Sequence, residues 1–409
     1  MKTILKIGFI GYGGRGRGLL KHTLMKTMVD SDGDFEICAV CDAYADRAKD
    51  AADVVEEKTG KRPFCTQDYR EVLRQDIDAI IIAAAWEAHI DIACEAMEKG
   101  IYVGMEVGGA YSVEDCWRLV DTFERTGTPC MLLENCCYGK REMMTLNMAQ
   151  QGAFGRISHC TGGYCHDLRD EIAGGEENRH YRLRNYLNRN CDNYPTHALV
   201  PLGKVLKIND GNRLVSMISM ASCAQGLNDY CRQAKGEDHP LCTAEFKQGD
   251  VISTIIKCAN GQTITLTLDT TLPRAYSREY TIHGTKASFF EQLDAFFIDE
   301  DHRGIEKPAL IRDNAKDYED QYLHPVWQGY DASGGHGGMD YLVLRAFIES
   351  AKAGIEPPVD VYDAATYMAI TALSEKSIAE GCTLQQIPDF TRGKWQNREP
   401  APQSKYALR

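Results

Sequence analysis

Residues 5–18 read LKIGFIGYGGRGRG, an apolar run followed by a glycine-rich turn. The glycines fall at Gly11, Gly13 and Gly16, which is the spacing of a dinucleotide-binding loop. In such a loop the first glycine allows a tight turn, the second lets the backbone approach a pyrophosphate, and the third lets the next helix pack on its strand. The helix N-terminus then offers N–H groups and partial positive charge to the phosphates. The stretch therefore predicts the first strand, loop and helix of a Rossmann domain.

The next apolar run, FEICAVCD at 35–42, ends in Asp42. An acid at this point accepts hydrogen bonds from a ribose diol and repels a 2′-phosphate, so NAD is favoured over NADP as the cofactor. Asp42 lies farther along the chain than the usual ~20 residues, which an extended first helix and its loop would explain. The alternative, a structural glycine turn with a capping aspartate, is disfavoured because the whole strand–loop–helix–strand context is present.

Apolar runs alternate with helical patterns over the first third of the chain. This alternation predicts an α/β domain with a parallel sheet, and we assign residues 1–145 to NAD binding. Later runs are longer and are joined by hairpin-like turns such as Asn260-Gly261. They predict an α+β domain, 146–409, with an open, mainly antiparallel sheet for substrate binding, catalysis and oligomerisation. Its helices are expected at residues 144–151, around 199–207, at 340–353 and at 362–380.

Composition and charge exclude several classes of function. The chain has 409 residues and a formal net charge of −13, with no basic run, so nucleic acid and anionic membranes are poor partners. The longest apolar run, residues 79–86, is too short to span a bilayer. The 16 cysteines are scattered and no metal-ligand spacing falls on one face, so we expect free thiols, no metal site and a reducing cytoplasm. The chain begins directly with its first strand, which favours the cytoplasm but leaves an exported form open.

A polar, aromatic and glycine-rich segment at 313–341 predicts a long loop able to cap a site. Within it, His336 and Asp340 flank Gly337-Gly338 at the start of a helical pattern. Glycines at such a point let the backbone approach a ligand closely.

With these elements the chain resembles the Gfo/Idh/MocA oxidoreductases, which join a Rossmann domain to an open antiparallel sheet. A narrower resemblance, to glycoside hydrolase family 109, covers nearly the whole chain. Members of that family keep NAD bound and hydrolyse α-N-acetylgalactosaminides, so the resemblance implies a carbohydrate substrate and an NAD cofactor. It also implies a homo-oligomer, because sheet faces commonly pair in this superfamily. The resemblance is carried by an ordered set of motifs: MEVGGAYSVEDCWRLVDT (105–122), LLENCCYG (132–139), GGYCHDLR (162–169), NYPTHALVP (193–201), LPRAYSREY (272–280), YLHPVW (322–327) and GGHGGMDYLVLRAFIES (334–350).

Residues 106–108 separate this chain from sugar dehydrogenases. Many of those enzymes carry Glu-Lys-Pro here and use the lysine in proton transfer, whereas this chain has Glu106, Val107 and Gly108. Valine cannot carry a proton, so we expect proton transfer to be reassigned to the second domain. Val107 is expected to shape the wall beside the nicotinamide.

The chemistry that the resemblance implies does not need the paired carboxylates of ordinary glycosidases, and no convincing pair stands out in the sequence. If NAD⁺ oxidises C3 of the sugar, the proton on C2 becomes acidic, elimination expels the C1 substituent, water adds back and the hydride returns. Such an enzyme needs a base for the C3 hydroxyl and a base at C2, but no net turnover of NAD.

His197 is the leading acid–base candidate, because Pro195 indicates a helix start and a helix N-terminus favours the neutral histidine that a base requires. Glu134 follows a strand at the edge where ligands bind, although a helix-capping role explains it equally well. Arg182 is a candidate for gripping sugar hydroxyls, with a solvated basic stretch as its alternative. His166 and Asp167 are expected to position Tyr164. By resemblance, the catalytic set is His197, Tyr164, Glu134, Tyr194 and Tyr276, and the substrate-binding set is Glu134, Tyr164, Arg182, Tyr194 and Tyr276.

The cofactor-binding residues combine the glycine loop with positions assigned by the resemblance. His89, which precedes a helix, is expected to support the cofactor edge. The full set is Gly11, Tyr12, Gly13, Gly14, Arg15, Gly16, Asp42, Trp86, His89, Glu106, Val107, Asn135 and His197.

Two other functions stay open on the sequence alone. A conventional NAD-dependent sugar or cyclitol dehydrogenase shares the same cofactor half, and Val107 in place of lysine speaks against it. A non-enzymic, nucleotide-sensing protein is the third interpretation, because a fold alone does not fix a function.

Overall fold

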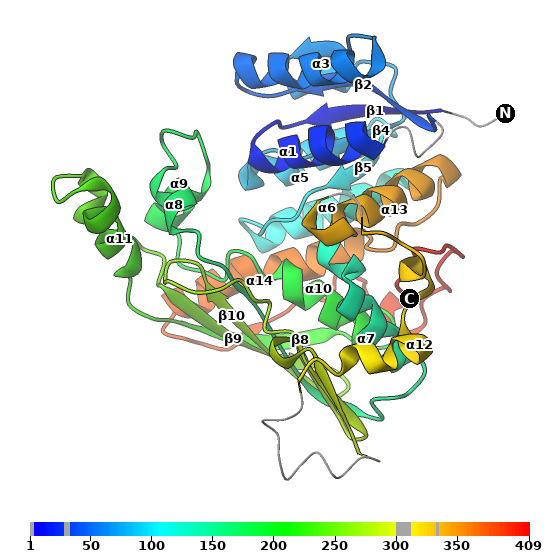
Figure 1. Ribbon diagram of the computed structural model, residues 1–409, viewed down its shortest axis with the longest axis vertical. Helices are drawn as coiled ribbons and strands as arrows, with labels where there is room; N and C mark the ends of the chain where they lie inside the picture. The colour runs from blue at the N-terminus through cyan, green and yellow to red at the C-terminus, as the bar shows by residue number, and fades with distance from the viewer. Residues whose placement is uncertain (1–3, 28–32, 300–311, 333–334) are drawn as a thin grey trace.

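The protein, seen in a computed structural model, consists of two sheets with helices packed around and between them (Figure 1). The structure describes residues 4–27, 33–299, 312–332 and 335–409. The predicted fold class is confirmed: a parallel Rossmann sheet forms the N-terminal half and a mainly antiparallel sheet the C-terminal half. Among the described residues, none of the helices combines the length and apolar character that crossing a membrane requires.

In the part of the chain that the structure describes, the N-terminal sheet has six parallel strands in the order β3-β2-β1-β4-β5-β6. The order reverses between β1 and β4, which is the switch point where ligands bind in such sheets. The strands are β1 (Leu5–Ile10), β2 (Phe35–Cys41), β3 (Phe64–Thr66), β4 (Ala79–Ile82), β5 (Tyr102–Met105) and β6 (Cys130–Leu132). Between them run α1 (Gly14–Arg17), the π-helical η1 (Gly18–Leu24), α2 (Met25–Thr27), α3 (Ala45–Thr59), α4 (Tyr69–Val72), η2 (Trp86–Ala88), α5 (His89–Met97) and α6 (Val113–Thr126).

Within the described residues, the C-terminal sheet has eight strands in the order β13-β12-β11-β7-β10-β9-β8-β14. Only β7 and β10 pair in parallel, and the other neighbours are antiparallel. The Asn260-Gly261 turn joins β9 to β10 as predicted. The strands are β7 (Ile157–Cys165), β8 (Leu214–Ala221), β9 (Val251–Cys258), β10 (Thr263–Asp269), β11 (Thr281–Gly284), β12 (Ala287–Phe290), β13 (Ala295–Ile298) and β14 (Gln385–Gln386).

The four predicted helices of this half are present as α7 (Lys140–Gln150), α10 (Thr196–Val205), α13 (Met339–Ala353) and α14 (Val361–Ala379). The sequence did not predict α8 (Arg169–Ala173), α9 (Arg182–Asn188) or α11 (Gly226–Lys235). The predicted 313–341 loop contains short helices: η8 (Ala315–Tyr318), α12 (Glu319–Tyr322), η9 (Pro325–Trp327) and η10 (His336–Gly338). Residues 333–334 of that loop lie outside the described part of the chain.

Two helices from the end of the chain join the halves (Figure 1). Helix α14 packs on α6 and β6 of the first half and on β8 and α10 of the second, so it is buried along most of its length. Helix α13 lies against the N-terminal half, where Arg345 forms a bidentate ion pair with Asp34 at 3.0 and 2.9 Å. The site is therefore assembled from segments far apart in sequence.

Candidate active site

The glycine loop between β1 and α1 has the shape that a dinucleotide needs. Gly11 has φ +96°, and a Cβ there would overlap the backbone of Ala83 at the end of β4. A Cβ on Gly16 would overlap the Gly11 carbonyl oxygen, so this residue must also be glycine. Around Gly14 a Cβ would meet nothing within 4 Å, which leaves this turn accessible. The loop thus fits a bound diphosphate, and Tyr12, Gly13 and Arg15 complete it.

Asp42 lies beside this loop at the end of β2. Its carboxylate accepts hydrogen bonds from the backbone N–H of Tyr12 at 2.6 Å and of Tyr44 at 2.9 Å. These bonds fix the carboxylate at the edge of the loop while each oxygen keeps a lone pair. The position therefore suits the predicted contact with a ribose diol.

Arg15 projects from the loop into a cluster of buried polar groups. Its guanidinium donates to Glu106, which follows β5, at 3.0 Å, and to both oxygens of Asp340 at 2.8 and 2.9 Å. Asn135 also donates to Asp340, at 2.8 Å. Burial raises the pKa of Glu106 above its usual range although Arg15 opposes the shift. Burial alone would raise the pKa of Asp340, but His336 and Arg15 hold it well below the usual range.

Three further predicted cofactor residues lie at the ends of β4 and β5. His89 begins α5 and its ring contacts the Ala84 carbonyl oxygen at 3.0 Å. Burial lowers the pKa of His89 to about 4, so this ring is neutral at physiological pH. Trp86 and Val107 are both buried, at 4% exposure each. All these positions lie at the carboxyl edge of the parallel sheet, where the resemblance places the cofactor.

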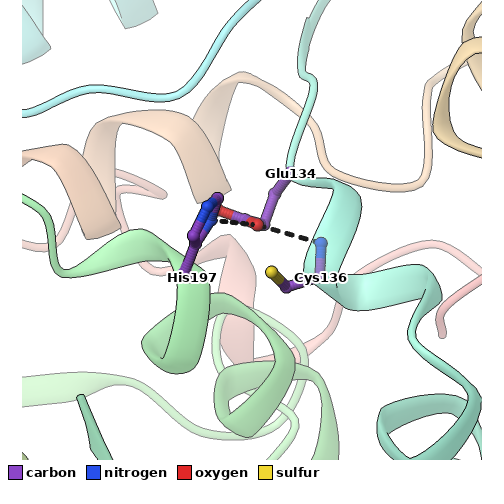
Figure 2. Close-up of side chains that lie close together, drawn as sticks. All are labelled: Glu134, Cys136 and His197. Atoms are coloured by element: carbon purple, nitrogen blue, oxygen red, sulfur yellow. Dashed lines mark hydrogen bonds and ion pairs between the residues drawn. The ribbon is translucent and has the colours of Figure 1, made fainter. Parts of the chain in front are cut away.

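Glu134 and His197 meet where the two halves join (Figure 2). Glu134 follows β6, His197 lies in the first turn of α10, and its Nδ1 lies 2.8 Å from Glu134 Oε1. The same oxygen accepts the Cys136 N–H at 3.0 Å, so the carboxylate caps η3 (Asn135–Tyr138) as well. Burial alone would raise the pKa of Glu134, but His197 and the Cys136 N–H outweigh it and lower the pKa. The capping interpretation of Glu134 is therefore confirmed, and its contact with His197 is compatible with the predicted functional role, which stays a prediction.

Two predicted tyrosines lie against His197, and a third lies farther out. The Tyr164 and Tyr194 ring centroids lie 5.4 and 4.8 Å from the His197 ring, and 4.4 Å from each other. Tyr276 lies farther out, 6.3 Å from Tyr164, and is 48% exposed at the mouth of this group. The Tyr164 hydroxyl lies 3.1 Å from His166 Nδ1, as predicted.

Arg182, at the start of α9, is buried with 7% exposure, so the solvated alternative is wrong. Its guanidinium lies over the rings of Trp86 and Tyr194, at 4.9 and 5.1 Å from their centroids. It also lies 2.6 Å from a Glu171 oxygen. Within the described residues, its Nη1 has no hydrogen-bond partner, so a donor is left for a ligand. Asp167, by contrast, pairs with Arg169 and not with the Tyr164–His166 unit.

The trio of Glu134, Cys136 and His197 brings three metal-ligand atoms within 4.8 Å of one another (Figure 2). Burial raises the pKa of the Cys136 thiol well above its usual value. Glu134 Oε1 is engaged by His197 and by the Cys136 N–H, so hydrogen bonds already join the trio.

Several neighbours of the site were not singled out from the sequence. The Tyr181 ring packs against Trp86 at a tilt, with centroids 4.7 Å apart, and Cys136 lies beside Glu134. Arg278 lies 3.4 Å from the Tyr276 hydroxyl and lines a cavity of about 210 Å³ with Lys140 and others. The sequence indicated two of these neighbours weakly, because Tyr181 and Arg278 each lie within three residues of a predicted site residue.

Comparisons with known proteins decide the family. Residues 138–397 match the family described as "Glycosyl hydrolase 109, C-terminal domain", and residues 5–133 match "Oxidoreductase family, NAD-binding Rossmann fold". The chain belongs to glycoside hydrolase family 109. A family 109 protein of Stenotrophomonas maltophilia is 37% identical over 97% of this chain and 91% of its own length. An α-N-acetylgalactosaminidase of Tannerella forsythia is 36% identical over 97% of this chain and 88% of its own length.

Solved structures share the fold at low identity. A levoglucosan dehydrogenase in complex with NADH and levoglucosan matches with a TM-score of 0.69 and 18% identity, covering 94% of this chain and all of that one. An inositol dehydrogenase homolog from Azotobacter vinelandii, in complex with NADH and myo-inositol, matches with a TM-score of 0.66 and 15% identity, covering 94% and 98%. The protein is therefore a glycoside hydrolase, with a carbohydrate substrate, on a fold that dehydrogenases also use.

Proposed function

We propose that this family 109 hydrolase cleaves α-N-acetylgalactosaminides with a retained NAD, through transient oxidation of the sugar at C3. The observation that carries the proposal is the buried Glu134–His197 pair, ringed by tyrosines, at the carboxyl edge of the glycine-loop sheet. The substrate is supported by relatives such as the Tannerella forsythia protein, which is named an α-N-acetylgalactosaminidase.

His197 is the base for the C3 hydroxyl in this proposal. Its Nδ1 is held by Glu134 Oε1, so Nε2 is the nitrogen left to take the proton. Glu134 fixes the orientation of the ring and stabilises the imidazolium that forms, because its pKa is lowered and it stays ionised. NAD, when bound, supplies the acceptor for the C3 hydride and returns the hydride at the end of the cycle.

Tyr164 is the base that accepts the proton from C2 of the sugar in this proposal. Burial raises the pKa of Tyr164 to about 12, so the free phenolate is scarce at neutral pH. The hydroxyl can pass its own proton to His166 Nδ1, 3.1 Å away, as it accepts the C2 proton. His166 is ready to accept because burial and the charge of Arg182 lower its pKa, which keeps the ring neutral. Elimination then expels the C1 substituent, and water later adds across the double bond.

The remaining residues of the site bind the sugar and the cofactor in this proposal. Arg182 offers Nη1 to a sugar oxygen, and Tyr194 and Tyr276 border the same space. The glycine loop with Asp42 holds the adenosine half of the cofactor. Glu106, Val107 and Asn135 would border the nicotinamide half, and Val107 stands where sugar dehydrogenases carry their proton-transferring lysine.

The decisive experiment is release of nitrophenol from an aryl α-N-acetylgalactosaminide by the purified protein with no NAD added. We expect cleavage, incorporation of deuterium at C2 of the product in D₂O, and NAD in the mass spectrum of the denatured protein. Reduction of added NAD⁺ by free sugars, without cleavage of any glycoside, would instead identify a conventional dehydrogenase and overturn the proposal.

A further inference from the structure

The first turn of α13 is tied directly to the glycine loop. Asp340 receives two hydrogen bonds from Arg15, which lies between Gly13 and Gly16 of that loop, at 2.8 and 2.9 Å. Bidentate pairs of this kind are among the strongest and most directional polar contacts in proteins. Asp340 is only 1% exposed, so solvent does little to weaken the contact.

The Asp340 carboxylate has two further partners on the cofactor side. Asn135 donates to it at 2.8 Å, and the His336 ring nitrogen lies 2.8 Å away. The segment before α13 is shaped around this carboxylate. A Cβ on Gly335 would overlap Asp340 Oδ2, and Gly337 and Gly338 both have positive φ values. The segment that carries Asp340 therefore folds so that one carboxylate holds Arg15 and Asn135 together.

Other contacts also attach α13 to the N-terminal half. About one and a half turns farther along, Arg345 pairs with Asp34, and about two turns along, Phe347 packs against Gly104. Asp34 is 5% exposed and lies before β2, away from the glycine loop. The helix thus has a separate anchor, and the Arg15–Asp340 pair is free to serve another purpose.

We infer that Asp340 is a positioning residue for cofactor retention: by fixing Arg15 and Asn135, it holds the glycine loop closed so that NAD does not exchange between turnovers. The inference rests on the proposed function. A dehydrogenase must release its reduced cofactor in every cycle, whereas a hydrolase that returns the hydride regains its oxidised cofactor and has no need to release it. A polar contact that holds the cofactor loop in place therefore suits the second kind of cycle.

The test compares Asp340→Asn with Asp34→Asn in the full-length protein. Each substitution removes one carboxylate charge from a bidentate arginine pair that joins α13 to the N-terminal half, but only the first touches the glycine loop. The readout is the rate at which bound NAD exchanges for isotopically labelled NAD, followed by mass spectrometry; this needs no catalytic activity. If a protein is purified without NAD, it is loaded with unlabelled NAD first.

We expect Asp340→Asn to accelerate exchange by about tenfold or more, because charge-assisted hydrogen bonds are lost from the loop. Asp34→Asn should leave the exchange rate within about twofold of the wild type while lowering the melting temperature, since only the separate anchor is weakened. Equal exchange rates for Asp340→Asn and the wild type would overturn the inference. So would an equal acceleration by Asp34→Asn, because the effect would then be general loosening of α13.

A second variant keeps the inference testable if Asp340→Asn does not fold. Arg15→Lys keeps the charge but loses the bidentate fork, and should also accelerate exchange. An unchanged rate of NAD exchange in Arg15→Lys would contradict the inference that the Arg15–Asp340 pair retains the cofactor. Failure of the proposed function would be seen in a different assay, as the absence of glycoside cleavage by the wild type without added NAD. That result does not depend on the ratio between the NAD exchange rates of variant and wild type.

Discussion

At the scale of single residues, the first prediction concerns catalysis by the Glu134–His197 pair. Glu134→Gln keeps the side-chain shape and an oxygen that can accept the Cys136 N–H, so the η3 cap survives. The variant loses the charge that stabilises a protonated His197. We expect kcat on an aryl glycoside to fall by about 10²-fold or more with little change in KM, because general acid–base catalysis contributes roughly 10²–10⁴-fold. A kcat close to wild type would show that Glu134 is only a cap.

Asp192, just before the Tyr194–His197 stretch, predicts a pH dependence of stability. It is 2% exposed, its Oδ2 has no hydrogen-bond partner among the described residues, and burial raises its pKa to about 7. An unfolded chain loses this proton near pH ~3.9. The folded protein therefore holds a proton that the unfolded chain lacks between these values, and the free energy of unfolding falls as pH rises through that window.

Asp192→Asn removes this titration, so its free energy of unfolding should fall less than that of the wild type between pH 5 and pH 8. The difference is about 2.7 kcal/mol, because roughly two pK units of the shift lie between pH 5 and the folded pKa of about 7. Urea denaturation at the two pH values measures it. The same change at the exposed Asp238 serves as the control and should leave the pH dependence unaltered. Parallel pH profiles for Asp192→Asn and the wild type would contradict the prediction.

At the scale of elements, α10 and α14 are joined by a buried ion pair. Lys204 Nζ lies 2.5 Å from Asp363 Oδ2, and the two side chains are 3% and 1% exposed. Lys204→Met leaves Asp363 without its cation, which should lower the free energy of unfolding by about 3–5 kcal/mol. The exposed pair Lys49–Asp53 on α3 is the control, and Lys49→Met should cost less than about 1 kcal/mol. Equal losses in chemical denaturation would contradict this assignment.

The elements that the sequence predicted are those with long, regular apolar patterns. Strands β1, β2, β4, β5 and β6 and helices α7, α10, α13 and α14 all followed such patterns. Strand β3 was missed because it is three residues long and mostly exposed, so it has no apolar run. Helix α11 was missed because only Leu227 and Cys231 are buried on it, and its sequence is otherwise polar.

The residues of the candidate site also divide into those that a sequence pattern predicted and those that have no such pattern. The glycines were predicted because the backbone of the loop dictates their residue type, and Asp42 was predicted because it ends the second strand of the same βαβ pattern. Glu134, His197 and the tyrosines were found through the resemblance, since a single histidine or tyrosine has no pattern of its own. The contact between Arg15 and Asp340 could not be predicted, because it joins residues 325 positions apart and depends on how α13 returns to the first half.

At the scale of the whole molecule, one face of the eight-stranded sheet stands out. Helices α10 and α14 lie on one side of this sheet, and no described helix covers the other (Figure 1). Strand β9 alternates strictly, with Ser253, Ile255 and Lys257 facing outward. Ile255 is 51% exposed and pairs with Ile218 on β8, and Met220 on β8 is 60% exposed. Exposed apolar side chains on an open sheet face are typical of an interface.

We predict that this face joins copies of the chain, and Ile255→Glu tests it. Light scattering should give the wild type a multiple of the 45.7 kDa chain mass, and the variant a lower mass, because burying an unpaired carboxylate in an interface costs several kcal/mol. Ile4→Glu is the matched control, since Ile4 is 49% exposed but precedes β1 in the other half. A monomeric wild type, or equal masses for the wild type and Ile255→Glu, would refute the prediction. A lower mass for Ile255→Glu with intact glycosidase activity would also show that each chain holds a complete site, as the contacts around Glu134 and His197 within one chain lead us to expect.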